Sequence, residues 1–166
     1  MSIYIVDTNF FIQAHRASYP LDVASSFWNK VKQLANEEKI LSIDKVKEEI
    51  YKNDDNLKKW CTDNLPENFF KDTAQIMTAY GQVVTWAASR SIHYLPNALA
   101  EFLSADEADA YVVAFALADK SSRVVVTQEI SEPTRKNKVK IPDACDALKV
   151  QFVNIMDMFR QLGETF

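Results

Sequence analysis

Four acidic side chains stand where they could act together on a metal ion. Asp7 and Glu129 each follow a short apolar run, and Glu49 and Asp109 lie beside the apolar faces of helical patterns. Clustered carboxylates repel one another and raise each other's pKa unless a cation is present. Ligands that are all oxygen atoms suit Mg²⁺ or Mn²⁺ better than zinc. The chemistry that such a site supports is phosphoryl transfer, in which the metal activates water.

Asp7 has two interpretations at this level. It opens the stretch Asp7-Thr8-Asn9, which leads into the apolar residues Phe10–Ile12. An aspartate in that place can simply cap a helix, and Thr8 or Asn9 could fill the same role. We therefore keep Asp7 as a candidate metal ligand and Asn9 as a candidate supporting residue.

The second acid requires a choice between Glu48 and Glu49. On a helix centred on Val46, Ile50 lies about 40° to one side, Glu49 about 60° to the other, and Glu48 about 160° away. Glu49 should border the buried stripe, whereas Glu48 should face water. The alternative for Glu49 is a boundary residue whose stem packs while its carboxylate reaches solvent.

The third acid is Asp109, within the segment Ser104–Ala110. Ser104 and Glu107 have the spacing of a capping box, which places Asp106 in the first helical turn, where the helix dipole favours an acid. Asp109 should then lie in the second turn, beside small apolar residues, where an acid is costly to bury without a partner. We expect Asp109 to be functional and keep Asp106 as a supporting candidate.

All but one of the remaining candidates follow the third apolar run. Thr127 and Glu129 lie directly after it, although a polar strand end leaving the sheet, taken alone, explains them better. Asp143 follows a proline and either caps a short helix or supports the site. Basic side chains that could contact phosphates, or simply line a solvated loop, are Arg16, Arg135, Lys136, Lys138 and Lys140.

Alternating short strands and helices must position these residues. Apolar, largely β-branched runs predict buried strands at Ile3–Val6, Lys39–Ile43, Val124–Val126 and Phe152–Ile155, with a further edge strand at Ser91–Leu95. Helical patterns cover Val23–Glu38, Asp44–Lys52, Asp72–Arg90, Ala105–Lys120, Asp143–Lys149 and Met156–Leu162, and the polar segment Thr62–Asn68 predicts a loop. This order predicts one α/β domain over residues 1–166, with a mostly parallel sheet that binds ligands at the carboxyl ends of its strands.

Composition excludes several classes of protein. The 166 residues include only two glycines, Gly81 and Gly163, and no glycine-rich phosphate-binding or dinucleotide motif. The two cysteines and two histidines are too scattered for a structural zinc site or a disulfide scaffold. We find no signal peptide and no membrane-spanning run, so we expect a cytoplasmic protein with no membrane partner. A net charge of −4 argues against a general nucleic-acid coat protein.

Taken in order, these segments resemble the motifs of PIN-domain nucleases over nearly the whole chain. The matching segments are Ile5–Asn9, Glu49–Ile50, Asp109–Ala116 and Val126–Glu129. The resemblance implies a three-layer α/β/α sandwich with a central parallel sheet, in which Asp7, Glu49 and Asp109 bind metal. Thr127 would be the polar residue of the last motif, and Glu129 would stand where the family usually has aspartate. The longer glutamate can still reach a metal or its water.

The resemblance also implies a biological role. Many small bacterial PIN proteins are toxins of toxin–antitoxin pairs that cut RNA with Mg²⁺ or Mn²⁺, and they commonly form homodimers. The extra segments of this chain look like a longer, uncharacterised PIN-like subfamily that is often encoded beside a putative antitoxin. We therefore expect an endoribonuclease with an RNA substrate and a protein antitoxin. The alternatives are a non-catalytic PIN-like module that binds RNA or protein, and a metal-dependent enzyme that acts on DNA or on another phosphoester.

Overall fold

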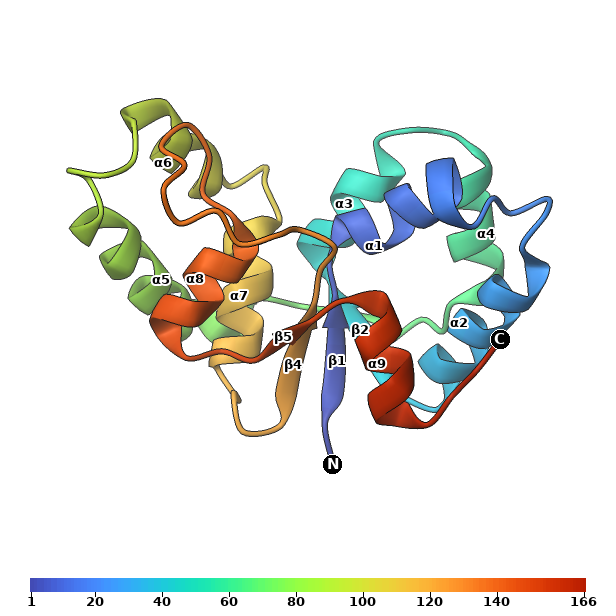
Figure 1. The fold of residues 1–166 in the computed structure, drawn as a ribbon. Coiled ribbons are helices and arrows are strands. Elements are labelled where there is room, and N and C mark those ends of the chain that lie inside the picture. Colours follow the sequence, from blue (N-terminus) through green and yellow to red (C-terminus); the bar gives the residue numbers. More distant parts are fainter.

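The computed structural model describes residues 1–166 and has a five-stranded, wholly parallel sheet at its centre (Figure 1). The strand order is β3-β2-β1-β4-β5, so β1 lies in the middle. The strands are β1 (Ile3–Val6), β2 (Ile40–Ile43), β3 (Phe70–Lys71), β4 (Arg123–Val126) and β5 (Phe152–Val153). Parallel pairing brings the carboxyl ends of all strands to one edge of the sheet, which is the arrangement the candidate site requires.

Helices cover both faces of the sheet and make a three-layer α/β/α sandwich, as expected from the sequence (Figure 1). The α-helices are α1 (Thr8–Gln13), α2 (Ser25–Asn36), α3 (Asp44–Tyr51), α4 (Asn56–Asn64), α5 (Met77–Ser89), α6 (Pro96–Phe102), α7 (Asp109–Leu117), α8 (Ile141–Leu148) and α9 (Ile155–Leu162). A π-helical turn, η1 (Ala14–Ser18), continues α1, and a 3₁₀ turn, η2 (Ala74–Ile76), precedes α5. None of these helices is both long and apolar enough to cross a membrane.

The central strands and α7 form the middle of the core. Tyr4, Ile5 and Val6 of β1 are buried, and the Tyr4 hydroxyl donates to Gln161 Oε1 of α9 at 2.7 Å. Side chains alternate along a strand, so Ile3 and Ile5 face the opposite layer, which contains α7. Every residue of Ala110–Ala116 in α7 is buried. This helix is apolar on all sides because it packs between the sheet and the helices α5 and α8.

Several elements differ from those expected. Ser91–Leu95 is a turn rather than an edge strand, because Pro96 starts α6 there and holds Leu95 in an extended conformation. The edge strand next to β2 is instead the two-residue β3. The predicted loop Thr62–Asn68 begins too early, since α4 starts at its cap Asp55 and extends to Asn64.

At two helix ends, a residue other than glycine adopts a left-handed backbone conformation. Glu38 and Lys149 follow α2 and α8 with φ angles of 58°, in the left-handed region where glycine is usual. The amides of the next residues, Lys39 and Val150, donate back to Leu34 O at 3.0 Å and Cys145 O at 2.9 Å. These bonds close the helix ends in the geometry of a Schellman motif, but with residues that are strained there.

Candidate active site

Asp7 lies at the carboxyl end of β1 and is only 1% exposed. Its Oδ1 accepts from the backbone N–H of Phe10 at 2.8 Å, so Asp7 does cap α1. Its Oδ2 is buried with no hydrogen-bond partner, and so is the hydroxyl of its neighbour Thr8. The pKa of Asp7 is raised to about 7, chiefly by burial; the Phe10 N–H and the nearby Thr127 hydroxyl oppose this shift, and the charges of Glu129 and Glu49 add to it. Helix capping therefore accounts for one oxygen of Asp7 and leaves the other free.

Asp109 lies in the first turn of α7 rather than in the second turn expected from the sequence. The segment Ser104–Ala108 forms a turn before the helix, in which the Glu107 amide donates to Ser104 O at 3.1 Å. The pKa of Asp109 is raised to about 8, chiefly by burial and also by the charges of Glu129, Asp7 and Glu49, while the charge of Lys138 opposes the shift. Three acids from three other segments therefore act on this carboxyl group.

Glu49 approaches the start of α7 from α3. Its Oε1 accepts from the backbone N–H of Ala108 at 2.6 Å, next to Asp109. Glu49 is half-buried and Glu48 is exposed, as the helical angles predict. The position of Glu49 beside Asp109 follows from the contact of α3 with the segment before α7, which the sequence pattern alone does not show.

Glu129 joins the site from the loop that follows β4. Its backbone N–H donates to the Thr127 hydroxyl at 3.1 Å, and its Oε2 accepts from Ile141 N, the first residue of α8, at 2.8 Å. Asp7 N donates to Val126 O at 3.4 Å, which joins the ends of β1 and β4. The two acids that follow strands thus lie at neighbouring strand ends.

The four acids come together as one electrostatic group, but their side chains do not converge on a point. No three Asp, Glu, His or Cys side chains are placed so that they could hold one ion. The reason is visible in the hydrogen bonds, since Glu49 and Glu129 each direct an oxygen to a backbone N–H. The unpartnered Oδ2 of Asp7 and the raised pKa values of Asp7 and Asp109 nevertheless show that these two carboxyl groups are unfavourable in their ionised form. Hard oxygen donors of this kind fit Mg²⁺ or Mn²⁺.

The supporting candidates divide into two groups. Thr127 is buried at the end of β4, and Asn9 is half-buried in the first turn of α1, so both lie next to the acids. The capping-box spacing predicts Asp106 in the first helical turn, and this prediction is wrong. Asp106 is exposed in the turn that precedes α7. Asp143 accepts from Ser131 Oγ at 2.5 Å and from Glu132 N at 3.1 Å, which uses both of its oxygens to hold the loop.

The basic candidates also differ in their surroundings. Lys138 lines a small cavity together with Asp109 and Glu107, and its charge lowers the pKa of Asp109. Arg135 and Lys140 instead contact Glu132, at 3.4 Å and 3.6 Å. Lys136 is exposed in the same loop, and Arg16 is exposed on η1 and is not among the charges that shift the pKa of Asp7 or Asp109.

Two neighbours of the acids were missed at the level of sequence. Burial and the charge of Glu49 raise the pKa of Glu107, whereas Lys52 and Lys138 lower it. Lys52 follows α3 three residues after Glu49, so the helical angles that selected Glu49 would also have placed Lys52 on that side. The capping-box spacing with Ser104 gave Glu107 a structural role, so it was not considered as part of the site.

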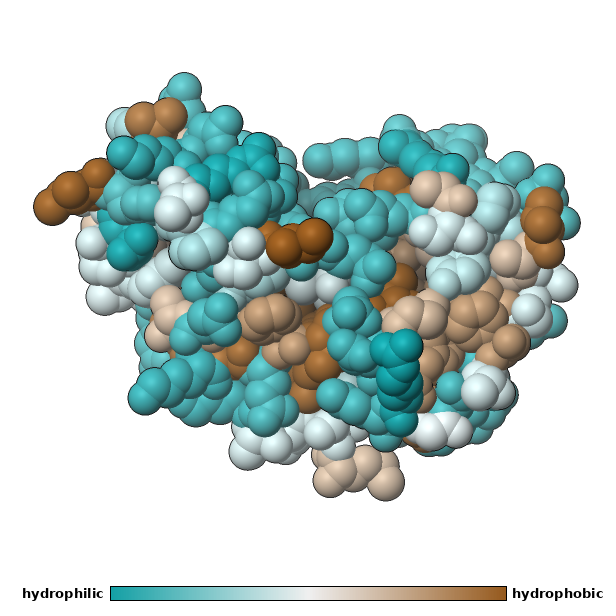
Figure 2. Space-filling model, viewed as in Figure 1, coloured by the Kyte–Doolittle hydropathy of each residue, from teal (hydrophilic) through white to brown (hydrophobic).

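On the surface, a notch lies between the lobe of α6 and the lobe of α1 and α3, and mostly hydrophilic side chains border it (Figure 2).

Comparison with known proteins identifies the family. Residues 4–166 match the family described as "Domain of unknown function (DUF4411)", and the chain belongs to it. No curated protein and no solved structure matches the chain.

Proposed function

We propose that this protein is a Mg²⁺- or Mn²⁺-dependent endoribonuclease of the PIN type. The observation that carries the proposal is the environment of Asp7, a carboxylate that is buried at the carboxyl end of the central strand with one oxygen unpartnered. Burying such a group is unfavourable unless a cation compensates it. The charges of Glu49 and Glu129 make the ionised form of Asp7 still less favourable, and the charge of Asp7 in turn raises the pKa of Asp109. The sequence order of the four acids resembles that of PIN nucleases.

The residues of the site divide the work of phosphodiester hydrolysis. Asp7 and Asp109 would hold the metal, and Glu49 and Glu129 would contact it directly or through water. When bound, the metal supplies an activated water and stabilises charge on the phosphate. Lys138 and Lys52 lie close enough to affect the pKa of an acid at this site, so they are the cations best placed to bind the RNA backbone.

The partners in this proposal follow from the same resemblance. As a toxin of a toxin–antitoxin pair, the protein would be inhibited by a protein antitoxin and would act as a homodimer in the cytoplasm. These proposals are separate from the chemistry of the site, and co-expression with the neighbouring gene product would test them without any assay of cleavage.

A matched pair of substitutions on α3 tests the proposal. Glu49→Gln and Glu48→Gln remove the same charge from adjacent residues, but only Glu49 borders Asp109. Cleavage of single-stranded RNA, single-stranded DNA and flap DNA is measured with Mn²⁺ and with EDTA, and Mn²⁺ binding is measured by calorimetry. We expect Mn²⁺-dependent cleavage of RNA by the parent and by Glu48→Gln. We expect at least a hundredfold loss in Glu49→Gln and in Asp7→Asn.

The other outcomes separate the alternatives. Mn²⁺ binding without cleavage of any substrate would indicate a non-catalytic module. Cleavage restricted to the DNA substrates would replace the ribonuclease assignment by a DNA nuclease. Equal activity of Asp7→Asn and the parent would exclude the mechanism.

A further inference from the structure

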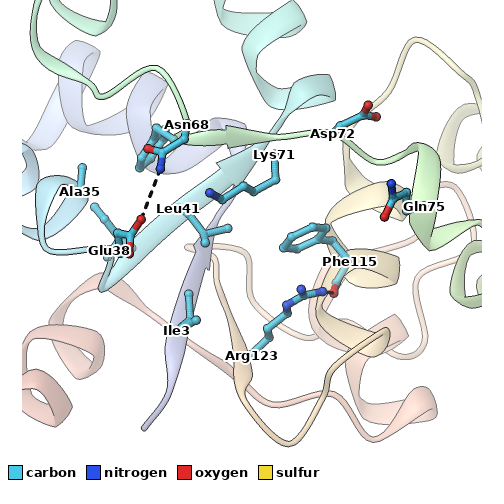
Figure 3. A pocket seen from close by; sticks show the side chains of 12 residues that line it. Ile3, Ala35, Glu38, Leu41, Asn68, Lys71, Asp72, Gln75, Phe115 and Arg123 are labelled. Atoms are coloured by element: carbon cyan, nitrogen blue, oxygen red, sulfur yellow. Dashed lines mark hydrogen bonds between the residues drawn. The ribbon is translucent and has the colours of Figure 1, made fainter.

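A second cavity, of about 510 Å³, is lined by residues at the amino ends of β1, β2 and β4 and by residues in and next to β3 (Figure 3). Ile3 of β1 and Leu41 of β2 form its floor, and Phe115 of α7 forms one wall. Ile3 precedes Asp7 by four residues, and a strand rises about 3.3 Å per residue, so Ile3 lies about 13 Å along β1 from Asp7. None of the four candidate acids lines this cavity. The cavity is therefore distinct from the candidate active site.

Ala35 of α2 and Phe115 of α7 both line the cavity, and part of the sheet between them stays open. Ile3 and Leu41 are only half-buried, whereas the rest of β1 is fully buried. Ile3 pairs with Arg123 and Ile5 with Leu41, so these residues share the face of the sheet that α7 covers further along. The result is an apolar floor that the protein itself leaves open.

Two cationic side chains line this cavity, and neither has a carboxylate partner. The guanidinium of Arg123 lies over the Phe115 ring, 3.9 Å from its centroid, and Nη1 donates to Phe115 O at 2.6 Å. These contacts fix the orientation of Arg123 and leave its other N–H groups available. Lys71 comes from β3 on another side, and its ammonium group has no hydrogen bond or ion pair in the cavity (Figure 3).

The acids at the rim do not neutralise these cations. Glu38 accepts from Asn68 Nδ2 at 3.3 Å, and Asp72 accepts from the backbone N–H of Ala74 at 2.7 Å within its own turn. Burial lowers the pKa of Arg123, and the charge of Asp119 is what opposes this effect. A partly buried guanidinium without an anion is an unfavourable arrangement that a bound anion would relieve.

We propose that this cavity binds a small organic anion. A flat apolar body would lie on Ile3, Leu41 and Phe115, and an anionic group would be bound by Arg123 and Lys71. The volume lies within the range of about 300–1,000 Å³ that is usual for small-molecule sites, which combine an apolar lining with few polar groups. Guanidinium groups bind carboxylates and phosphates in the same two-pronged geometry, so the ligand is an aromatic carboxylate or a nucleotide-like phosphate.

Calorimetry on the full chain, in EDTA to keep the acidic site metal-free, tests this proposal with defined probes. The anions are 2-naphthoate, 2-naphthyl phosphate and AMP, and the uncharged control is 2-naphthylmethanol. We expect at least one anion to bind at least tenfold more tightly than the control. Preference for naphthoate would identify a carboxylate ligand, and preference for naphthyl phosphate or AMP a phosphate ligand.

Two variants should weaken binding of the preferred anion at least tenfold, Arg123→Met and Lys71→Met. The matched control is Arg90→Met, because Arg90 also lies over an aromatic ring, 5.7 Å from the centroid of Tyr94, but lines a different cavity. Thermal melting checks that each variant is folded, and Lys71→Met alone decides if Arg123→Met does not fold. The proposal is overturned if no anion binds below 5 mM, if 2-naphthylmethanol binds equally well, or if only Arg90→Met reduces binding.

Discussion

Replacing Asp7 by asparagine should stabilise the metal-free protein at pH 8 while abolishing its response to Mn²⁺. The pKa of Asp7 rises from 3.8 to about 7 on folding, and each pH unit between these values corresponds to about 1.4 kcal/mol, so the ionised group destabilises the fold by about 4 kcal/mol. The folded protein binds the extra proton between about pH 4 and pH 7. The free energy of unfolding therefore falls as pH rises through this interval, and the loss is complete above pH 7.

Asparagine removes the buried charge, but its side-chain amide is still a buried polar group. Its Oδ1 can still accept from Phe10 N, whereas its amide N–H₂ would occupy the place of the unpartnered Oδ2, at a cost of about 1–3 kcal/mol. We therefore expect a net gain of about 1–3 kcal/mol at pH 8. The gain at pH 5 should be about 3 kcal/mol smaller, because there the parent is still largely protonated at Asp7 in the folded state.

Urea unfolding followed by tryptophan fluorescence measures these differences at pH 5 and pH 8, in EDTA and in MnCl₂. Mn²⁺ at one hundred times its dissociation constant should raise the free energy of unfolding of the parent by about 2.7 kcal/mol, and that of Asp7→Asn should not increase. Glu48→Gln serves as the control because its carboxylate is exposed on α3 and contacts only Lys45, at 3.9 Å. Parallel pH profiles of the parent and Asp7→Asn in EDTA, or equal stabilisation of both by Mn²⁺, would refute the reasoning.

Three further substitutions test other parts of the structure. Lys138→Met should weaken binding of single-stranded RNA and reduce the magnitude of the slope of log affinity against log salt concentration by about 0.7. Lys136→Met, in the exposed part of the same loop, should change the affinity and the slope less. Binding titrations at four salt concentrations measure the affinity and the slope. Lys149→Gly should raise the free energy of unfolding by about 1 kcal/mol, because glycine adopts the positive φ without strain, and Lys149→Ala should not; urea unfolding distinguishes them. Phe27→Ala should destabilise the fold by about 3–5 kcal/mol in the same assay, since the ring is completely buried between α1, α2 and α9; a loss below 1 kcal/mol would contradict this packing.

The sequence was most informative where one physical requirement dominates. The strands β1, β2 and β4 are apolar because both faces of the sheet are covered, and this makes them easy to recognise. The strand β3 has only two residues, and its existence depends on pairing with β2, which no local pattern reveals. The helix α4 had a visible signal that was overlooked, the cap Asp55 followed by buried residues four positions apart, Leu57 and Cys61.

The same distinction applies to the candidate site. The burial of Glu49 follows from helical angles, and the unfavourable burial of Asp109 follows from its apolar neighbours, so both were predictable from local sequence. The exact start of α7 was not, because the turn at Ser104–Ala108 competes with the helix for the same residues. Nor was the contact of Glu129 with Ile141 N, which depends on how the intervening loop folds back onto the sheet edge.

The acidic net charge of −4 and the two glycines have a common physical consequence at the carboxyl edge of the sheet. Without a glycine-rich loop, backbone N–H groups do not form a cradle for phosphate there, so positive charge must come from side chains or from a bound cation. At pH 7, the raised pKa values of Asp7 and Asp109 keep protons on the metal-free site, and the formal charge overstates its negative potential. Binding of a divalent ion would displace those protons and still add positive charge. Under the proposed function, the acidic net charge is therefore compatible with a polyanionic substrate if a divalent cation binds before the substrate or together with it.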